Sequence, residues 1–152
     1  METLHFEVDI QAPVGVVWRT MLDDETYRQW TGAFHEGSYY DGGWATGDSI
    51  RFLGPDGDGK EGGMIGFIDV ARPEEFVSIE YTGQMHHGVE DFSSDEAKKL
   101  IGLHENYTFV ERDGVTTLSI DVDSIDEWGD MFEGMWPAAL GRLKEMAEHS
   151  PR

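Results

Sequence analysis

The stretch SIDEWGDMFEGMWPAALGRLKEMAEH, residues 124–149, has the pattern of one long amphipathic helix. Its apolar side chains recur at steps of three and four residues, which places them on one helical face. They are Trp128, Met131, Phe132, Met135, Trp136, Ala139, Leu140, Leu143, Met146 and Ala147. Ser124 and Glu127 fit a capping box at the start, and Pro137 predicts a bend inside the helix. Because such a face must be buried, we expect the preceding chain to cover it.

The chain before this helix has the signals of one strand, two short helices and a run of antiparallel strands. Residues 4–10 alternate between apolar and polar, as in a strand with one solvated face. Pro13 and Asp23 mark the starts of two short helices. From residue 48 onward, short alternating segments are separated by turns, among them the hairpin signal Asp113-Gly114. Antiparallel strands with helices on one face predict a single α+β domain over residues 1–152.

The composition argues against several classes of protein. The 152 residues include 31 acidic and 11 basic side chains, which gives a net charge of -20. Nucleic acids and anionic membranes are bound through basic patches, so neither is expected as a partner. The chain has no cysteine, which removes disulfides and thiolate catalysis. No stretch approaches the ~20 apolar residues of a membrane span and the first residues are acidic, so we expect a cytoplasmic protein without membrane insertion.

A set of short motifs runs through nearly the whole chain. They are Ala12-Pro13, Val17-Trp18, Leu22-Asp23, Trp30, the Gly66-centred strand before Pro73, and Trp136-Pro137-Ala138-Ala139-Leu140 followed by Leu143-Lys144. These motifs closely resemble the SRPBCC superfamily, also called START-like or Bet v 1-like. Within it they are similar to the branch named after the C-terminal domain of the activator of Hsp90 ATPase. The resemblance implies a helix-grip fold, in which a strongly curved antiparallel sheet wraps around the long C-terminal helix with a cavity between them.

Two departures from the family pattern bear on that cavity. Met135 stands where members commonly have glycine, which predicts a narrower cavity. Residues 83–102 form a longer insertion than many members carry. Ser93 and Glu96 fit a capping box and Gly102 fits a helix end, so we expect a short helix inside the insertion. We interpret the insertion as a lid over the cavity mouth or as a stabilising flap, and the two roles are compatible.

The glycine-rich loop of residues 54–63 imitates two phosphate-binding motifs. It satisfies G-x-G-x-x-G, and it matches a P-loop up to the final Ser or Thr. Both motifs present backbone N–H groups at a helix N-terminus, whereas this loop leads into a predicted strand and carries several acids. Asp56 and Asp58 also suggest a calcium loop, but Lys60 stands at a ligand position. We therefore expect a plain hairpin loop and no cofactor.

Histidines beside the insertion allow a metal site to be drawn from His86, His87 and His104 with neighbouring carboxylates. Their spacing matches no known metal motif. We therefore expect no metal, and we interpret the three residues as hydrogen-bonded or solvated histidines.

Glu105 has the strand parity of Tyr107 and Phe109, so its carboxylate should point inward if those rings do. A buried carboxylate is costly unless it is paired or has a function. Arg51 and Tyr81 are the candidate partners. We favour a structural ion pair or an exit to solvent at the strand end, and we keep Glu105 as the candidate catalytic acid.

The leading functional hypothesis is a non-enzymatic protein that binds a small apolar ligand, such as a lipid, an aromatic compound or a polyketide-like molecule. The residues expected to line the cavity are Trp30, Trp44, Phe52, Met64, Tyr81, Met85, Tyr107, Met131, Phe132, Met135 and Trp136. The competing explanation is that these side chains simply form the core. Two other functions stay open: a module that contacts a chaperone, as the resemblance suggests, and a cyclase or hydrolase that uses Glu105.

Overall fold

An antiparallel sheet organises the computed structural model, which describes residues 2–55, 59–125 and 129–150. Within those ranges the sheet has eight strands: β1 (Glu2–Ile10), β2 (Tyr39–Gly42), β3 (Ser49–Pro55), β4 (Glu61–Arg72), β5 (Phe76–His86), β6 (Val89–Asp91), β7 (His104–Arg112) and β8 (Val115–Ser124). The helices are α1 (Val14–Leu22), α2 (Asp24–Trp30), α3 (Asp95–Leu100) and α4 (Gly129–Glu148), and a 3-10 turn, η1 (Thr31–Ala33), follows α2. The strand order is β1-β8-β7-β5-β4-β3-β2, and β6 pairs with β5.

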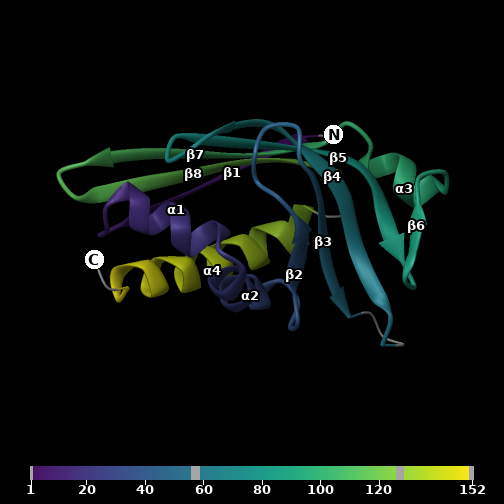
Figure 1. The fold of residues 1–152 in the computed structure, drawn as a ribbon, viewed down its shortest axis with the longest axis horizontal. Helices are drawn as coiled ribbons and strands as arrows, with labels where there is room; N and C mark the ends of the chain where they lie inside the picture. The colour runs from purple at the N-terminus through teal and green to yellow at the C-terminus, as the bar shows by residue number, and fades with distance from the viewer. Residues whose placement is uncertain (1, 56–58, 126–128, 151–152) are drawn as a thin grey trace.

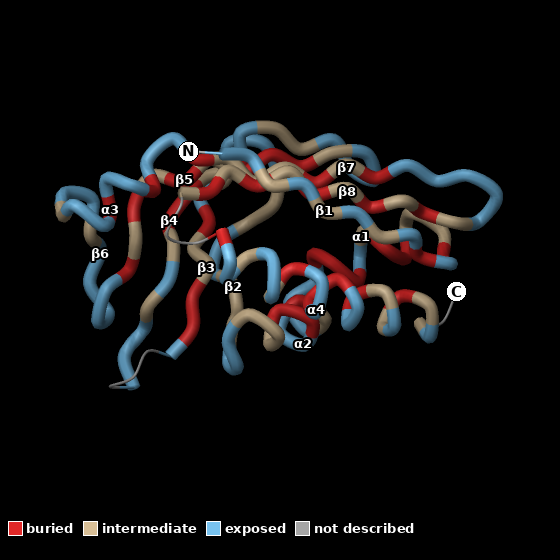
Figure 2. Tube along the Cα trace, turned by 180° about the vertical axis from the view of Figure 1, so that it is seen from behind, coloured by how far each residue is buried: buried red, intermediate tan, exposed pale blue. Residues whose placement is uncertain are grey.

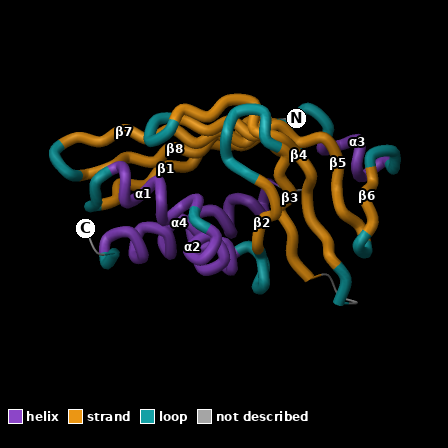
Figure 3. Tube along the Cα trace, in the orientation of Figure 1, coloured by secondary structure: helices purple, strands orange, loops and turns teal. Residues whose placement is uncertain are grey.

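Helices α1, α2 and α4 lie on one side of the sheet, which curves over α4 (Figure 1). Figure 3 shows that the ends of β3, β4 and β5 bend down beside α4, while β1, β7 and β8 run above it. This arrangement is the helix-grip α+β fold that the sequence predicted. None of the helices in the described ranges combines the length and apolarity that crossing a membrane requires.

The core lies between the sheet and α4 (Figure 2). The predicted apolar face of the helix is divided along its length. In the C-terminal part, Ala139, Leu140, Leu143 and Ala147 are buried. In the N-terminal part the burial is incomplete, and Met131 is 45% exposed. Only the C-terminal part of the face is therefore filled by the rest of the chain.

The start of α4 differs from the expected capping box. Ser124 is the last residue of β8 and pairs with Glu2 of β1, so it does not cap the helix. The first helical residue described is Gly129, and the predicted Glu127 and Trp128 lie outside the described residues. The periodic pattern could not locate the end of the strand, because a serine fits both a strand and an N-cap.

The insertion at residues 83–102 continues the sheet before it forms a helix. Gly83 lies inside β5, β6 pairs back on β5, and α3 packs against β5. The cap of α3 lies one residue later than predicted, because the Ser94 hydroxyl oxygen accepts a 3.1 Å hydrogen bond from the backbone N–H of Ala97. Gly102 follows the helix with φ +85°, as a closing glycine should.

A β-bulge on β5 changes which of its residues face α4. Gly66 of β4 is opposite Tyr81, but Ile65 is opposite Gly83, so Thr82 is an extra residue on β5. Because side chains alternate along a strand, one extra residue reverses the two faces beyond the bulge. Figure 1 shows that this last part of β5 leads away from α4 towards β6 and α3.

Candidate ligand-binding site

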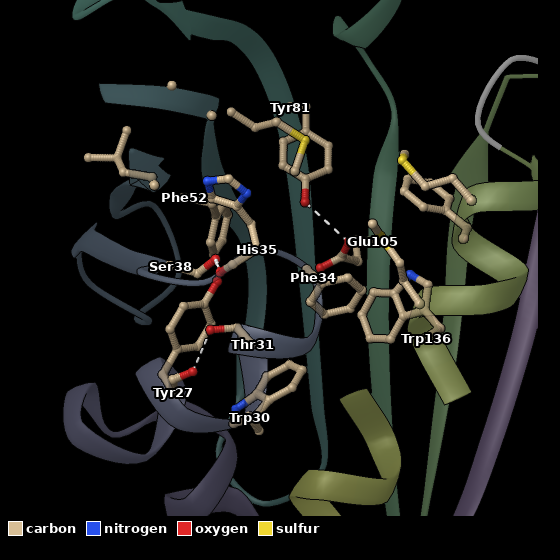
Figure 4. Close-up of a pocket in the computed structure, with 18 of the residues that line it drawn as sticks. Tyr27, Trp30, Thr31, Phe34, His35, Ser38, Phe52, Tyr81, Glu105 and Trp136 are labelled. Atoms are coloured by element: carbon tan, nitrogen blue, oxygen red, sulfur yellow. Dashed lines mark hydrogen bonds between the residues drawn. The ribbon is translucent and has the colours of Figure 1, made fainter. Parts of the chain in front are cut away.

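A cavity of about 400 Å³ lies between the sheet and the N-terminal part of α4. Its lining comes from α2, η1 and the loop after it, from β3, β4, β5 and β7, and from α4. The lining residues are Tyr27, Trp30, Thr31, Phe34, His35, Ser38, Phe52, Leu53, Gly54, Pro55, Gly62, Gly63, Met64, Tyr81, Glu105, Tyr107, Met131, Phe132, Met135 and Trp136. Most of them are aromatic or otherwise apolar, so the cavity presents a mainly apolar surface (Figure 4).

Aromatic rings form a connected series in this wall, in which Trp30 contacts both Tyr27 and Phe34. On the α4 side, the ring centroid of Trp136 lies 4.8 Å from that of Phe34 and 6.1 Å from that of Tyr107. On the α2 side, Phe52 lies 6.3 Å from Tyr27 and 6.1 Å from Tyr81. Edge-on and tilted pairs at these distances are favourable contacts between large rigid side chains. These contacts therefore give the cavity wall a defined shape.

Glu105 places a carboxylate in this apolar wall. The Tyr81 hydroxyl donates to Glu105 Oε1 over 3.2 Å, and the Tyr107 hydroxyl donates to Oε2 (Figure 4). The three side chains come from adjacent strands, β5 and β7, which holds them in register. The cavity thus contains one acidic group, clamped by two phenols.

The surroundings perturb the titration of all three groups. Burial raises the pKa of Glu105, and the hydrogen bonds from Tyr107 and Tyr81 oppose that rise. Burial, followed by the nearby Glu105 charge, raises the pKa of Tyr81 and Tyr107 well above the usual phenol value. Both tyrosines consequently remain protonated hydrogen-bond donors at neutral pH.

Three other polar side chains in the lining form hydrogen bonds to the backbone. The Thr31 hydroxyl donates to the Tyr27 carbonyl over 2.5 Å, and the Ser38 hydroxyl donates to the His35 carbonyl over 2.5 Å. His35 Nε2 donates to the Pro55 carbonyl, which links the loop after η1 to β3. These bonds fix the wall where α2 and the loop after η1 meet β3.

The structure brings nine of the eleven predicted ligand-binding residues to the cavity wall. They are Trp30, Phe52, Met64, Tyr81, Tyr107, Met131, Phe132, Met135 and Trp136. Whether they bind a ligand stays a prediction. Met135 lines the space, as expected for a side chain that narrows it.

Trp44 and Met85 are not among the lining residues. Trp44 packs beside the wall, with its ring centroid 5.3 Å from Tyr40 and 5.8 Å from Phe52. Met85 lies beyond the bulge at Thr82 and is buried in a separate cluster with Leu53 and Ile65. Met85 would share the face of Tyr81 if the strand alternated without interruption, and the extra residue at Thr82 reverses that face.

Several lining residues were missed in the sequence. Phe34, His35 and Ser38 belong to an aromatic and glycine-rich segment without a clear period, so nothing in the pattern oriented them. Tyr27 had a usable signal, because it precedes Trp30 by three residues on a helix and therefore shares its face. Gly54 and Gly63 of the β3–β4 hairpin also line the cavity, and an added Cβ there would lie 2.8 Å from His35 Cδ2 and 1.8 Å from the Phe52 carbonyl oxygen, respectively.

Glu105 faces the interior as its parity predicted, and Tyr81 is one of its partners. The favoured ion pair with Arg51 was wrong. Arg51 forms an ion pair with Glu90 instead, and Glu90 lies on β6, the strand that pairs with β5. Strand parity located the carboxylate, but alternation along single strands did not reveal which neighbours the sheet would bring to it.

The other motifs lie away from the cavity. His104 Nε2 lies 3.2 Å from Glu80 and 3.8 Å from Asp69, while the rings of His86 and His87 contact each other at the β5–β6 turn. These histidines therefore do not form a common cluster. Residues 56–58 of the glycine-rich loop, with Asp56 and Asp58, lie outside the described residues, and a strand follows the loop, as predicted.

The insertion also lies apart from the cavity. No residue between 83 and 102 is among the described residues that line it. A lid would need a hinge at its ends, such as Gly83. Gly83 instead packs closely inside the sheet, where an added Cβ would lie 2.5 Å from Phe92 Cδ1 and 2.8 Å from the Asp91 carbonyl oxygen. The placement of the segment agrees better with a stabilising flap than with a lid.

Solved structures share this fold. DynU16, a protein of the dynemicin biosynthetic locus, superposes with a TM-score of 0.71 at 19% identity over 98% of this chain. The match covers 48% of DynU16, so this chain spans about half the length of that relative. The Aha1 dimer from Colwellia psychrerythraea gives a TM-score of 0.71 at 14% identity, with 98% of each chain covered. An uncharacterised protein from Rhizobium leguminosarum gives 0.66 at 20% identity, covering 98% of this chain and 95% of the other.

These likenesses establish the fold, because identities this low carry no further information about function. No curated protein is similar enough in sequence to count as a relative. One family, described as activator of Hsp90 ATPase homolog 1-like protein, matches residues 11–148. The predicted resemblance is thereby confirmed over nearly the whole chain, which belongs to this activator of Hsp90 ATPase homolog 1-like family.

Proposed function

We propose that this protein binds a small, mainly apolar ligand in the cavity between the sheet and α4. The cavity carries the proposal. Protein cores rarely contain voids larger than a water molecule, whereas this space measures about 400 Å³. Ligand pockets typically have volumes of about 300–1,000 Å³ and mainly apolar walls with a few polar groups. A core that was merely loosely packed would close around such a space.

The lining also suits an adaptable apolar partner. Met64, Met131 and Met135 border the cavity, and methionine side chains adjust their shape at small cost. Met131 and Met135 lie on α4, opposite Met64 on β4. Rigid aromatic rings on the remaining wall would set the overall size of the ligand, and the methionines would fit its outline.

Two measurements test the proposal. Native mass spectrometry of the purified protein should reveal a bound small molecule, and the neutral dye N-phenyl-1-naphthylamine should gain fluorescence when it enters the cavity. Met135→Trp should abolish dye binding, because the larger side chain occupies the cavity. Met146→Trp provides the control, since Met146 lies on the same helix but does not line the cavity. If neither a bound molecule nor dye binding is found, the proposal fails.

The family description allows a second role, namely contact with a chaperone of the Hsp90 class. Such contact would use the outer surface and would not need the cavity. Stimulation of Hsp90 ATP hydrolysis by the wild-type protein and by Met135→Trp therefore separates the two functions. Equal stimulation by both proteins would support a chaperone role that does not depend on a ligand.

A further inference from the structure

Glu105 is a carboxylate in an apolar wall without a basic partner among the described residues that line the cavity. Those residues include no lysine and no arginine. The hydroxyls of Tyr81 and Tyr107 give hydrogen bonds but no positive charge. Burial of a carboxylate costs free energy that hydrogen bonds offset only in part. A ligand could supply the missing charge.

The hydrogen-bond inventory determines what kind of ligand group fits. Each phenol has one O–H donor, and the hydroxyls of Tyr81 and Tyr107 both donate that hydrogen to Glu105. Their oxygen atoms can then only accept, and a carboxylate can also only accept, with about four lone-pair sites for two donors. This group of three side chains therefore presents acceptors to the cavity. It matches a ligand group that donates hydrogen bonds and repels one that only accepts them.

Charge and ring electrostatics point in the same direction. The chain carries a net charge of -20, so the electrostatic potential around the protein is negative, which attracts cations and repels anions. Phe34 and Trp136 pack edge to face beside Glu105 in the wall (Figure 4). The faces of aromatic rings attract cations, and aromatic cages with a nearby carboxylate suit organic ammonium groups.

We propose that the ligand of this cavity is an apolar molecule with a protonated amine, whose ammonium group binds the Glu105 carboxylate between Tyr81 and Tyr107. This inference rests on the proposed function and names the ligand class. The apolar body would lie against Phe52, Met135 and Trp136. A fatty acid would place its carboxylate against Glu105 or outside the cavity, so an anionic lipid is the wrong ligand.

Three probes with one apolar body and different head groups test the ligand class. They are 1-naphthylmethylamine, 1-naphthalenemethanol and 1-naphthaleneacetate, each titrated against wild-type protein loaded with N-phenyl-1-naphthylamine at neutral pH. The amine should displace the dye at concentrations on the order of ten-fold lower than the alcohol, as expected for a hydrogen bond to a charged group. The carboxylate should be the weakest competitor of the three.

Variants assign the effect to Glu105. In Glu105→Gln the amine should lose its advantage over the alcohol, because the neutral amide offers no negative charge to the ammonium group. Glu7→Gln removes the same charge from the exposed face of β1 and should keep the full preference for the amine. Tyr107→Phe should weaken the preference less than Glu105→Gln, because it removes only one of the two clamping hydroxyls.

The outcomes distinguish this inference from the proposed function. If the dye and the alcohol bind but the amine shows no advantage in wild-type protein, the amine inference is overturned and the binding function stands. An amine preference that persists in Glu105→Gln overturns the assigned residue. If the dye does not bind wild-type protein at all, the proposed function fails. Because the probe ranking is measured on wild-type protein, the test survives a variant that does not fold.

Discussion

Tyr107 donates its hydroxyl hydrogen to the carboxylate of Glu105, two residues earlier on β7. Residues two apart on a strand share a face, so the same alternation that points Tyr107 into the cavity also points Glu105 there. Tyr81 on the neighbouring strand completes the clamp from the other side. The alternation of side chains along β7 therefore determines that the Glu105 carboxylate points into the cavity.

This buried acid should make stability depend on pH. Burial raises the pKa of Glu105 in the folded protein, and the unfolded chain lacks that effect. Between the unfolded and the folded pKa the folded state binds more protons, so the free energy of unfolding falls as pH rises through this range. The Glu105→Gln variant has no carboxyl at this position, so its free energy of unfolding should not fall in this way. It should approach the wild type near pH 4 and become more stable than the wild type at neutral pH, by about 1.4 kcal/mol for each unit of the shift.

Urea unfolding at a series of pH values measures this difference. Glu7→Gln, on the exposed face of β1, controls for the loss of one negative charge. A Glu105→Gln variant that is less stable by the same amount at every pH would show that the folded pKa of Glu105 is not raised, because the two tyrosine hydrogen bonds balance the cost of burying the charge.

Trp136 should contribute more to stability than Trp44. Trp136 is 3% exposed and contacts Phe6 at 6.0 Å and Phe34 at 4.8 Å between ring centroids. Replacing it with alanine should cost ~3–5 kcal/mol through lost transfer energy and an enlarged cavity. Trp44 is half-buried at the edge of the aromatic wall, so Trp44→Ala should cost less. Equal, small losses in chemical denaturation would mean that Trp136 does not anchor α4.

The helix-grip fold could be predicted from the sequence because its signals are local. The three-and-four pattern fixed α4, alternation identified the strands, and Asp113-Gly114 forms the predicted turn with φ values of +53° and +81°. The pairing between strands could not be predicted in this way, because it depends on contacts between distant parts of the chain. The bulge at Thr82 depends on how β4 and β5 fit together, and the adjacent Gly83 is compatible with a bulge but does not determine it.

The candidate site could be predicted only where it follows these local patterns. Residues on α4 and on β5 before the bulge were located, whereas Met85, beyond the bulge, was not. The hydroxyl clamp on Glu105 needed the register of β5 against β7. The insertion was interpreted as a lid because its sequence position lies between two strands, but position along the chain does not say to which side of the sheet a segment folds.

Replacing Met64 or Met85 with alanine should affect different properties: Met85→Ala mainly the stability, and Met64→Ala mainly the affinity for the dye. Met64 lines the cavity, while Met85 is buried in the cluster with Leu53 and Ile65. Met85→Ala should lower the free energy of unfolding by ~2–5 kcal/mol and leave dye affinity unchanged. Met64→Ala should cost less stability and shift dye affinity, because it enlarges a space that is already open. If Met85→Ala changed dye affinity and Met64→Ala did not, the bulge at Thr82 would be misplaced.

Gly83 and Gly141 form a second contrasting pair. An added Cβ at Gly83 would come within 2.8 Å of the Asp91 carbonyl oxygen, so Gly83→Ala should destabilise the protein by ~1–3 kcal/mol. At Gly141, inside α4, an added Cβ meets nothing within 4 Å. Gly141→Ala should therefore stabilise the helix by ~0.5–1 kcal/mol. Thermal unfolding of both variants measures the contrast, and a neutral Gly83→Ala would revive the hinge interpretation.

The excess of acids predicts that salt stabilises the protein. The chain has 31 acidic and 11 basic side chains, and some of the bases are already held in pairs, such as Arg28 with Asp24 and Lys144 with Glu148. The remaining acids repel one another in the folded state, and salt screens this repulsion over a Debye length of about 10 Å at 0.1 M. The melting temperature should therefore rise as sodium chloride is added from low ionic strength. Tetramethylammonium chloride at equal ionic strength should have the same effect, because screening does not depend on the cation. A rise with sodium alone would indicate specific cation binding, and a flat curve would show that the acids lie too far apart to repel.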